Sequence, residues 1–308
     1  MATDEKHTDD PREVMAERRH LINLAYRLLG SAAEAEDAVQ ETYARWYALS
    51  DDQRDSIRSP GAWLTTVAGR ICLDLLGTAR VRRERYVGEW VPEPLPQTTD
   101  WIRGGGQDYG PTGDPAERIT LDESVTMAFL VSLESMTPAE RVALILHDVF
   151  GYAFAEVATI VGRTPAACRQ LASSARRRAR SRRPGPVATD RAEEAVRAFK
   201  QAWESRDIRA LLSVLDPDAT AVADSNGLTQ AALTPIEGAD RVAQHYLMLA
   251  ERAPADITIS ERIVNGQPGL VMEHQGSTVT VLAFDVVGDR ITHLWAVLNP
   301  DKLQLWSS

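Results

Sequence analysis

The sequence predicts a multidomain fold: two all-α domains followed by one α+β domain. Apolar residues recur at helical spacing over most of the first 183 residues, with a Pro- and Gly-rich break at 88–115. After residue 250 the pattern changes to strands separated by Gly or Asn-Gly turns. Helices first and a meandering sheet afterwards are typical of an α+β domain, and 308 residues suffice for two or three cores.

The first helical part is predicted over residues 12–49 and 60–85. Gly30 stops its opening helix, and Ser31 with Glu34 three residues later is typical of a capping box that starts the next one. The opening helix should bury Leu21, Ile22, Leu24, Ala25, Leu28 and Leu29. The second helix should present a polar and charged face made of Asp37, Gln40, Glu41 and Arg45.

The sharpest local pattern is a helix-turn-helix at residues 154–180. Gly162 suits a sharp turn, while Thr164 and Pro165 are typical of an N-cap and a first helical position. The second helix should keep Ala167, Leu171 and Ala175 on one face. Its other faces carry Arg169, Gln170, Ser173, Arg176 and Arg177. Arg and Gln read guanine and adenine edges, so this helix is expected to enter the major groove of DNA.

Positive charge is concentrated in two places, although the net charge of the chain is −10. Residues 163–183 contain no acid and eight arginines: Arg163, Arg169, Arg176, Arg177, Arg178, Arg180, Arg182 and Arg183. A second cluster, interrupted by Glu84, contains Arg80, Arg82, Arg83 and Arg85. An acidic protein with two compact basic islands can bind nucleic acid at those islands and repel it elsewhere.

Other chemistry is not indicated. Cys72 and Cys168 lie far apart in helical patterns and are expected to be small buried hydrophobes in a reducing compartment. We find no P-loop, dinucleotide motif or metal-ligand spacing, so no cofactor and no metal are expected. The polar N-terminus and the lack of a run of ~20 apolar residues predict a cytoplasmic protein without a membrane partner.

Three long segments resemble sigma factors of the extracytoplasmic-function (ECF) group. AYRLLGSAAEAEDAVQETYARWY at 25–47 and SPGAWLTTVAGRICLDLLGTARVRRERYVG at 59–88 are similar to sigma region 2. SLESMTPAERVALILHDVFGYAFAEVATIVGRTPAACRQLASSARRR at 132–178 is similar to region 4. The resemblance implies an RNA polymerase sigma factor, with bacterial core polymerase and promoter DNA as partners.

Three short motifs narrow the resemblance to sigma factors of the SigJ-type group, which carry a SnoaL-like extension. They are WVPEP at 90–94, DSNG at 224–227 and NPDKL at 299–303. In this group the extension folds like a nuclear-transport-factor-2 cone and adjusts sigma activity, so no separate anti-sigma factor is expected. The implied domains are region 2 at 10–88, a flexible linker at 89–115, region 4 at 116–183 and the cone at 190–308.

The resemblance also assigns roles to individual residues. Asp37, Gln40, Glu41 and Arg45 should face the polymerase clamp. The residues expected near the −10 element are Arg70, Asp74, Arg80, Arg82 and Arg83. Those expected near the −35 element are Thr164, Arg169, Gln170, Ser173, Arg176 and Arg177. Gly77 and Ser174 stand where arginines are common in the family, which should weaken DNA binding, and Gly77 should weaken its helix by about 1 kcal/mol.

The three short motifs are expected to form one regulatory contact between the linker and the cone. A stiff segment is expected from Trp90, Pro92, Glu93 and Pro94. Its tryptophan side chain can dock on a partner with little loss of entropy. Its expected acceptors are Asp224, Asn226, Gly227, Asn299, Pro300, Asp301 and Lys302. The alternative is that WVPEP is a flexible tether and NPDKL a turn that closes the sheet.

Two other functions stay open. The chain could be a plain helix-turn-helix regulator, or its cone could bind or convert a small molecule. A base for catalysis would come from Asp224, His245, Asp285 or His293, and a pocket from Trp203, Tyr246, Met248, Met272 and Trp295. No two of these have a spacing that fixes them in one site, so the chain is expected not to be an enzyme.

Overall fold

The computed structural model describes residues 11–83, 86–99, 101, 119–180, 189–227 and 234–306. The chain forms two compact units. Unit 1 contains Met1–Gly77, Asp100–Leu121 and Pro138–Ser174, and unit 2 contains Thr78–Thr99, Asp122–Thr137 and Ala175–Ser308. No helix in the described part of the chain is long and apolar enough to cross a bilayer.

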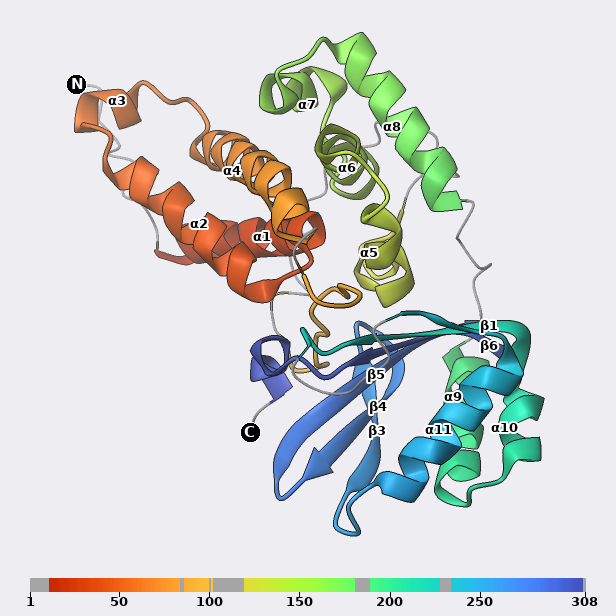
Figure 1. The fold of residues 1–308 in the computed structure, drawn as a ribbon. Coiled ribbons are helices and arrows are strands. Elements are labelled where there is room, and N and C mark those ends of the chain that lie inside the picture. Colours follow the sequence, from red (N-terminus) through yellow and green to blue (C-terminus); the bar gives the residue numbers. More distant parts are fainter. Residues whose placement is uncertain are drawn as a thin grey trace. The chain divides into compact units, whose positions relative to one another are not determined.

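Unit 1 is helical, and two of its helices, α4 and α8, continue into unit 2 (Figure 1). Its elements are α1 (Pro11–Leu29), α2 (Ala32–Tyr47), α3 (Asp51–Asp55), α4 (Pro60–Arg83), α6 (Pro138–Leu144), the π-helical turn η3 (Ile145–Val149), α7 (Phe154–Val161) and α8 (Pro165–Arg180).

The first helices begin and end where their sequence indicates. All six apolar residues expected to be buried in α1 are buried. Gly30 then adopts a φ of 72°, a left-handed conformation that glycine tolerates at a helix end. The hydroxyl of Ser31 accepts a hydrogen bond from the backbone N–H of Glu34, which confirms Ser31 as the N-cap of α2.

Unit 2 is built around one six-stranded sheet with strand order β2-β1-β6-β5-β4-β3. Strands β1 and β6 pair in parallel, and every other neighbouring pair is antiparallel. The strands are β1 (Leu215–Asp224), β2 (Ile236–Glu237), β3 (Thr258–Val264), β4 (Gln267–His274), β5 (Ser277–Val287) and β6 (Arg290–Val297). The helices are α5 (Met127–Leu133), α9 (Thr189–Glu204), α10 (Ile208–Val214) and α11 (Ala239–Arg252), with short 3-10 turns η2 (Glu123–Val125), η4 (Pro300–Lys302) and η5 (Gln304–Trp306).

The two faces of this sheet are covered by different parts of the chain. Helices α9, α10 and α11 cover one face and enclose an apolar core around Phe199, whose ring packs against Trp203 and Tyr246 (Figure 1). The opposite face carries a second apolar cluster that includes Val91 of the linker and Met127 of α5. Because side chains alternate along a strand, β5 and β6 contribute to both clusters.

The predicted strands correspond to β3–β6. Strand β1 was not predicted, although it lies inside the sheet between β2 and β6. Its sequence, LDPDATAVAD, contains Pro217 and three aspartates, which are depleted in strands. The pairing with β6 shifts register between Leu215 and Thr220, and this irregularity accommodates the proline. Both cysteines are buried and unpaired, as predicted.

Candidate functional site

The linker segment from Val91 to Leu95 is buried within unit 2. Pro92 and Pro94 have no backbone N–H, so the segment offers N–H donors only at Val91, Glu93 and Leu95. Two of these bind side chains of the C-terminal sheet domain. Val91 N donates to Asp224 Oδ2 at 2.8 Å, and Leu95 N donates to Asn265 Oδ1 at 3.0 Å. The segment is therefore held by its backbone as well as by its side chains.

Asp224, the last residue of β1, is the centre of this contact. Its side chain is fully buried and accepts hydrogen bonds from Tyr86 Oη, Val91 N and Lys302 Nζ. The backbone carbonyl of Asp224 accepts from the N–H groups of Leu298 and Asn299. One carboxylate thus joins the linker, the end of β1 and the turn after β6.

Lys302 supplies the opposite charge from the 3-10 turn η4. Its Nζ lies 2.6 Å from Asp224 Oδ2 and 2.5 Å from the carbonyl oxygen of Val91. The same ammonium lies 4.2 Å from the centroid of the Trp90 ring and 5.3 Å from that of Tyr86, both cation–π contacts. A buried ammonium needs several partners, and this one has a carboxylate, a carbonyl and two aromatic faces.

Three further residues of this contact escaped the sequence reasoning. Tyr86 Oη accepts a hydrogen bond from Asn299 Nδ2 at 2.9 Å, and burial with its hydrogen bond to Asp224 raises the pKa of this phenol. Trp306 Nε1 donates to the carbonyl of Pro94 at 2.8 Å. Asn265 Nδ2 donates to the carbonyl of Val125, just before α5. Asn265 was recognised only as part of an Asn-Gly turn, which gives no signal of its second role.

The DSNG turn lies against Val87, which shortly precedes the linker. Asn226 and Gly227 adopt φ values of 49° and 71°, which is the left-handed region. A Cβ atom on Gly227 would lie 2.8 Å from Val87 Cγ1, so only glycine fits here without displacing Val87. Within the described part of the chain, the side chain of Asp301 is exposed and forms no hydrogen bond or ion pair.

The helix-turn-helix forms as predicted, with one shift of phase. Gly162 ends α7 with a φ of 69°, and Thr164 Oγ1 accepts from Ala167 N at 3.2 Å to cap α8. The face shared by Ala167, Leu171 and Ala175 is not the most buried one, because Ala167 and Leu171 are only half-buried. The buried stripe is Cys168, Ala172, Ala175 and Ala179. Both stripes consist mainly of small residues, so the sequence pattern does not show which of the two is buried.

The residues expected at the −35 element lie on the outer faces of α8 and at its start. Thr164, Arg169, Gln170, Ser173 and Arg177 are exposed, and Arg176 is half-buried. The Arg169 guanidinium also lies 5.8 Å from the Phe154 ring centroid. Ser174 does not join this surface, because its hydroxyl donates to Glu140 Oε1 at 2.8 Å.

The expected polymerase-binding residues share the exposed face of α2. Asp37, Gln40, Glu41 and Arg45 are all exposed, and Arg45 pairs with Glu41 at 2.9 Å. Tyr47 lies at the end of the same helix with 60% of its surface exposed, and its ring stacks on Tyr43. An exposed face that carries both charges and aromatics is typical of a surface for a protein partner.

The residues expected at the −10 element are only partly placed. Arg70 and Asp74 are exposed on α4, and the side chains of Arg80, Arg82 and Arg83 lie outside the described residues. Arg70 Nη2 donates to the carbonyl of Thr159 in α7 at 2.9 Å. In this structure Arg70 therefore links α4 to the helix-turn-helix.

Further contacts inside unit 1 join the same helices. Tyr152 Oη donates to Thr65 Oγ1 at 3.2 Å and lies 2.9 Å from His20 Nε2. A Cβ on Gly69 would lie 2.8 Å from Ile160 Cγ2, so the absence of a side chain permits close approach of α4 and α7. Within unit 1, these contacts join residues of the segments that resemble regions 2 and 4.

Comparison with known proteins identifies the family. Residues 14–83 match the profile described as Sigma-70 region 2, and residues 126–178 match Sigma-70, region 4. The chain is 36% identical to "ECF RNA polymerase sigma factor SigJ" of Mycobacterium tuberculosis, covering 94% of this chain and 92% of the relative. The chain belongs to the ECF RNA polymerase sigma factors. It is a transcription initiation factor.

Two other similarities agree with this family. The sigma factor is 33% identical to "Probable ECF RNA polymerase sigma factor SigI" of Mycobacterium tuberculosis, over 94% of this chain and 92% of that protein. The crystal structure of Mycobacterium tuberculosis SigJ superposes with a TM-score of 0.72 at 34% identity, covering 96% of this chain and 98% of that chain. The predicted order of two helical sigma domains and an α+β domain is confirmed.

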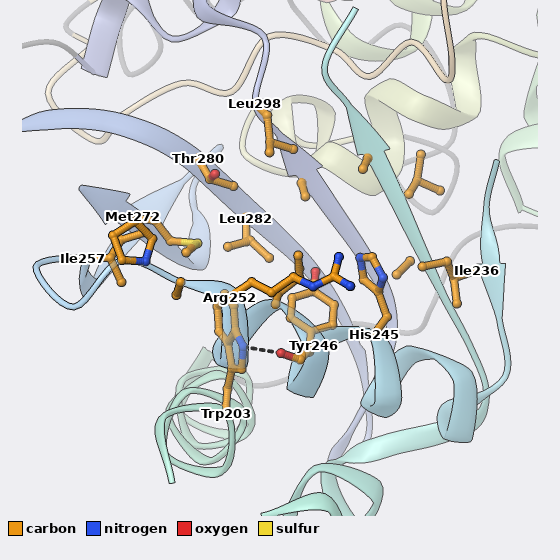
Figure 2. Close-up of a pocket in the computed structure, with 17 residues that line it drawn as sticks. Trp203, Ile236, His245, Tyr246, Arg252, Ile257, Met272, Thr280, Leu282 and Leu298 are labelled. Atoms are coloured by element: carbon orange, nitrogen blue, oxygen red, sulfur yellow. Dashed lines mark hydrogen bonds between the residues drawn. The ribbon is translucent and has the colours of Figure 1, made fainter. Parts of the chain in front are cut away.

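The catalytic alternative loses most of its candidate residues in the structure of this sigma factor. Asp224 binds the linker. Asp285 and His293 lie side by side, 3.6 Å apart, but His293 stacks on Trp295 of the linker-side cluster, and neither residue lines the cavity described next. A cavity of about 610 Å³ does exist on the helix-covered face, and His245 lines it together with Trp203, Tyr246 and Met272 (Figure 2). Among the described residues that line it there is no carboxylate. The relatives named above are sigma factors rather than enzymes.

Proposed function

We propose that the C-terminal domain regulates this sigma factor by holding the linker between its two DNA-binding regions. The observation that carries the proposal is the buried Asp224 carboxylate, which binds Tyr86, Val91 and Lys302 together. A segment that contacts a buried ion pair is held more firmly than a flexible tether, because its release exposes the Asp224–Lys302 pair to water or leaves it without the hydrogen bonds of Tyr86 and Val91.

Regulation follows from competition for one segment. By resemblance, the linker of ECF sigma factors threads toward the active cleft of RNA polymerase. The residues from Val91 to Leu95 are buried in unit 2, so they cannot contact polymerase while they are docked. The C-terminal domain and the polymerase therefore compete for the linker, and the domain lowers transcription until the linker is released. A built-in competitor also makes a separate anti-sigma factor unnecessary.

Three surfaces complete the proposed function, within functional domains at 10–88, 116–183 and 190–308 and the linker at 89–115. Polymerase binding is assigned to Asp37, Gln40, Glu41 and Arg45. Contacts near the −10 element are assigned to Arg70, Asp74, Arg80, Arg82 and Arg83. Contacts near the −35 element are assigned to Thr164, Arg169, Gln170, Ser173, Arg176 and Arg177. Among these residues, every side chain that the structure describes is exposed or half-buried, which supports its assignment. To contact DNA, Arg70 must give up its hydrogen bond to the carbonyl of Thr159.

In vitro transcription with full-length protein, core RNA polymerase and a promoter pool tests the regulation. Point variants test the regulation more specifically than a chain that ends near Arg183. That truncation would also expose the apolar surface that Val91 and Met127 bury against the sheet. Asp224→Asn keeps the shape of the side chain but removes its charge. It should weaken the docked state and raise the number of transcripts per sigma molecule several-fold.

Asp301→Asn is the matched control, since it makes the same chemical change on an exposed residue of η4, the turn that carries Lys302. It should transcribe like the wild type. Equal transcription by wild-type protein and Asp224→Asn, with linker release shown by faster proteolysis, would contradict the competition. Equal transcription and equal proteolysis would show that the carboxylate does not hold the linker.

A further inference from the structure

The cavity on the helix-covered face of the sheet has the size of a small-molecule site. Its volume is about 610 Å³, and ligand pockets typically span ~300–1,000 Å³. Its walls come from strands β1, β2, β4, β5 and β6, from α9 and α11, and from the turn after α11 (Figure 2). These elements all belong to unit 2, so the cavity is internal to one compact body.

The lining is apolar over most of its surface and polar at one side. Met272 and Leu282 are among the apolar residues of the sheet wall. Trp203 Nε1 is already satisfied, because it donates to the backbone carbonyl of Tyr246 at 2.8 Å. The remaining hydrogen-bonding side chains with open capacity include His245 and Arg252, both from α11.

Helix geometry brings these two polar side chains together. His245, Leu249 and Arg252 are spaced i, i+4 and i+7 along α11 and so share the face that lines the cavity. Figure 2 shows the Arg252 side chain extended across the cavity with its guanidinium directed toward the His245 ring. The His245 ring lies 5.8 Å from the Tyr246 ring, nearly perpendicular to it.

The positive charge at this side of the cavity has no acidic partner among the described lining residues. Burial lowers the pKa of His245, so its imidazole is neutral near pH 7. The Arg252 guanidinium forms no ion pair with any described residue, and no described lining residue is an acid. A permanent cation at the rim of an apolar cavity without a carboxylate partner favours an anionic ligand.

We propose that this cavity binds a small carboxylic acid with an apolar body. The carboxylate accepts hydrogen bonds from Arg252 and His245, and the apolar body packs on Met272 and Leu282. This site is distinct from the linker contact, which lies at Asp224 and on the opposite face of the sheet. The proposal therefore goes beyond the proposed function and does not depend on it.

Isothermal titration calorimetry on the full-length protein tests the site with two matched pairs of probes. The acids are decanoate and 1-naphthaleneacetate, and the controls are decanamide and 1-naphthaleneacetamide, which keep the apolar body without the charge. At least one acid should bind about tenfold more tightly than its amide, since hydrogen bonds to a charged group are stronger than those to a neutral one. No binding by either acid, or equal binding by acid and amide, would overturn the proposal.

Three variants locate the binding. Arg252→Gln should remove the preference for the acid, while Arg241→Gln, on the same helix but outside the cavity lining, should keep it. Ala296→Phe places a ring inside the cavity and should abolish binding of acid and amide alike. Circular dichroism melting of Ala296→Phe separates a filled cavity from a misfolded domain. Acid preference retained in Arg252→Gln, or binding retained in a folded Ala296→Phe, would place the ligand elsewhere and overturn the proposal.

Discussion

Asp224 and Lys302 form an ion pair in which 0% and 9% of the two side chains are exposed, with Nζ 2.6 Å from Oδ2. Removing such charges from water costs several kcal/mol each, and the hydrogen bonds around the pair offset that cost. Two of those hydrogen bonds come from Tyr86, just before the linker, and from Val91 within it, and one more goes to the Val91 carbonyl. Release of this segment therefore removes three hydrogen bonds from the ion pair.

Lys302→Met should destabilise the protein strongly. The substitution keeps the aliphatic stem but leaves the Asp224 carboxylate buried without its cation, which costs about 3 kcal/mol. Urea unfolding followed by circular dichroism should show a lower midpoint than the wild type. The double variant Lys302→Met with Asp224→Asn should recover part of the loss, because no charge then stays buried alone. A double variant less stable than Lys302→Met would contradict this account.

Two glycines of α4 should respond in opposite directions to the same substitution. A Cβ on Gly77 meets no atom within 4 Å, so Gly77→Ala should stabilise the helix by about 1 kcal/mol. A Cβ on Gly69 would lie 2.8 Å from Ile160 Cγ2, so Gly69→Ala should destabilise unit 1 despite its better helix propensity. Thermal melting of both variants checks this, and a shift of the same sign in both would contradict the close packing of α4 on α7.

His245 should make the protein less stable in mild acid. Its pKa in the folded state is lowered from 6.5 by burial, so below pH 6.5 the unfolded chain binds a proton that the folded chain does not. Stability contributed by neutral His245 is therefore present above pH 6.5 and is lost as the pH falls. Urea unfolding at pH 5.5 and 7.5 should show a larger loss for the wild type than for His245→Gln. An equal loss in both would show that His245 titrates normally.

Glu41→Lys should weaken binding to core RNA polymerase without unfolding α2. Glu41 is exposed, and its ion pair with Arg45 is also exposed, so the charge reversal costs little stability. If α2 faces the polymerase, reversing one charge at the interface should lower affinity about tenfold. Surface plasmon resonance with immobilised core polymerase measures this. Glu194→Lys, an identical change on the exposed side of α9, should bind normally; equal binding by Glu41→Lys would remove Glu41 from the interface.

The sequence predicted the helical elements well where local signals agree. Ser31, Gly30 and Gly162 mark helix ends through capping or a left-handed φ, and all three act in the structure as their residue types indicate. The phase of α8 was less certain because alanines occur on several of its faces. With no large apolar side chain to favour one stripe, only packing against a neighbour selects Cys168 and Ala172.

Long-range features were predicted only where a family motif marked them. Trp90, Asp224 and Lys302 lie together, as the three short motifs suggested. Tyr86, Asn265 and Trp306 take part in the same contact, yet none belongs to a motif. Strand β1 shows the same limit, since its proline and aspartates oppose a strand and only pairing with β6 overrides that preference. The local periodicity of apolar residues does not indicate tertiary contacts between segments that are distant in the sequence.

The Asp224–Lys302 contact joins two stretches of one polypeptide, with Val91 and Lys302 separated by 211 positions. Capture of the linker is therefore unimolecular, and the docked fraction is independent of dilution. A cell that makes more of this protein increases docked and released molecules in the same ratio. In the proposed regulation, the stoichiometry of factor to inhibitor is fixed at translation, so neither gene dosage nor unequal turnover of two subunits can change it.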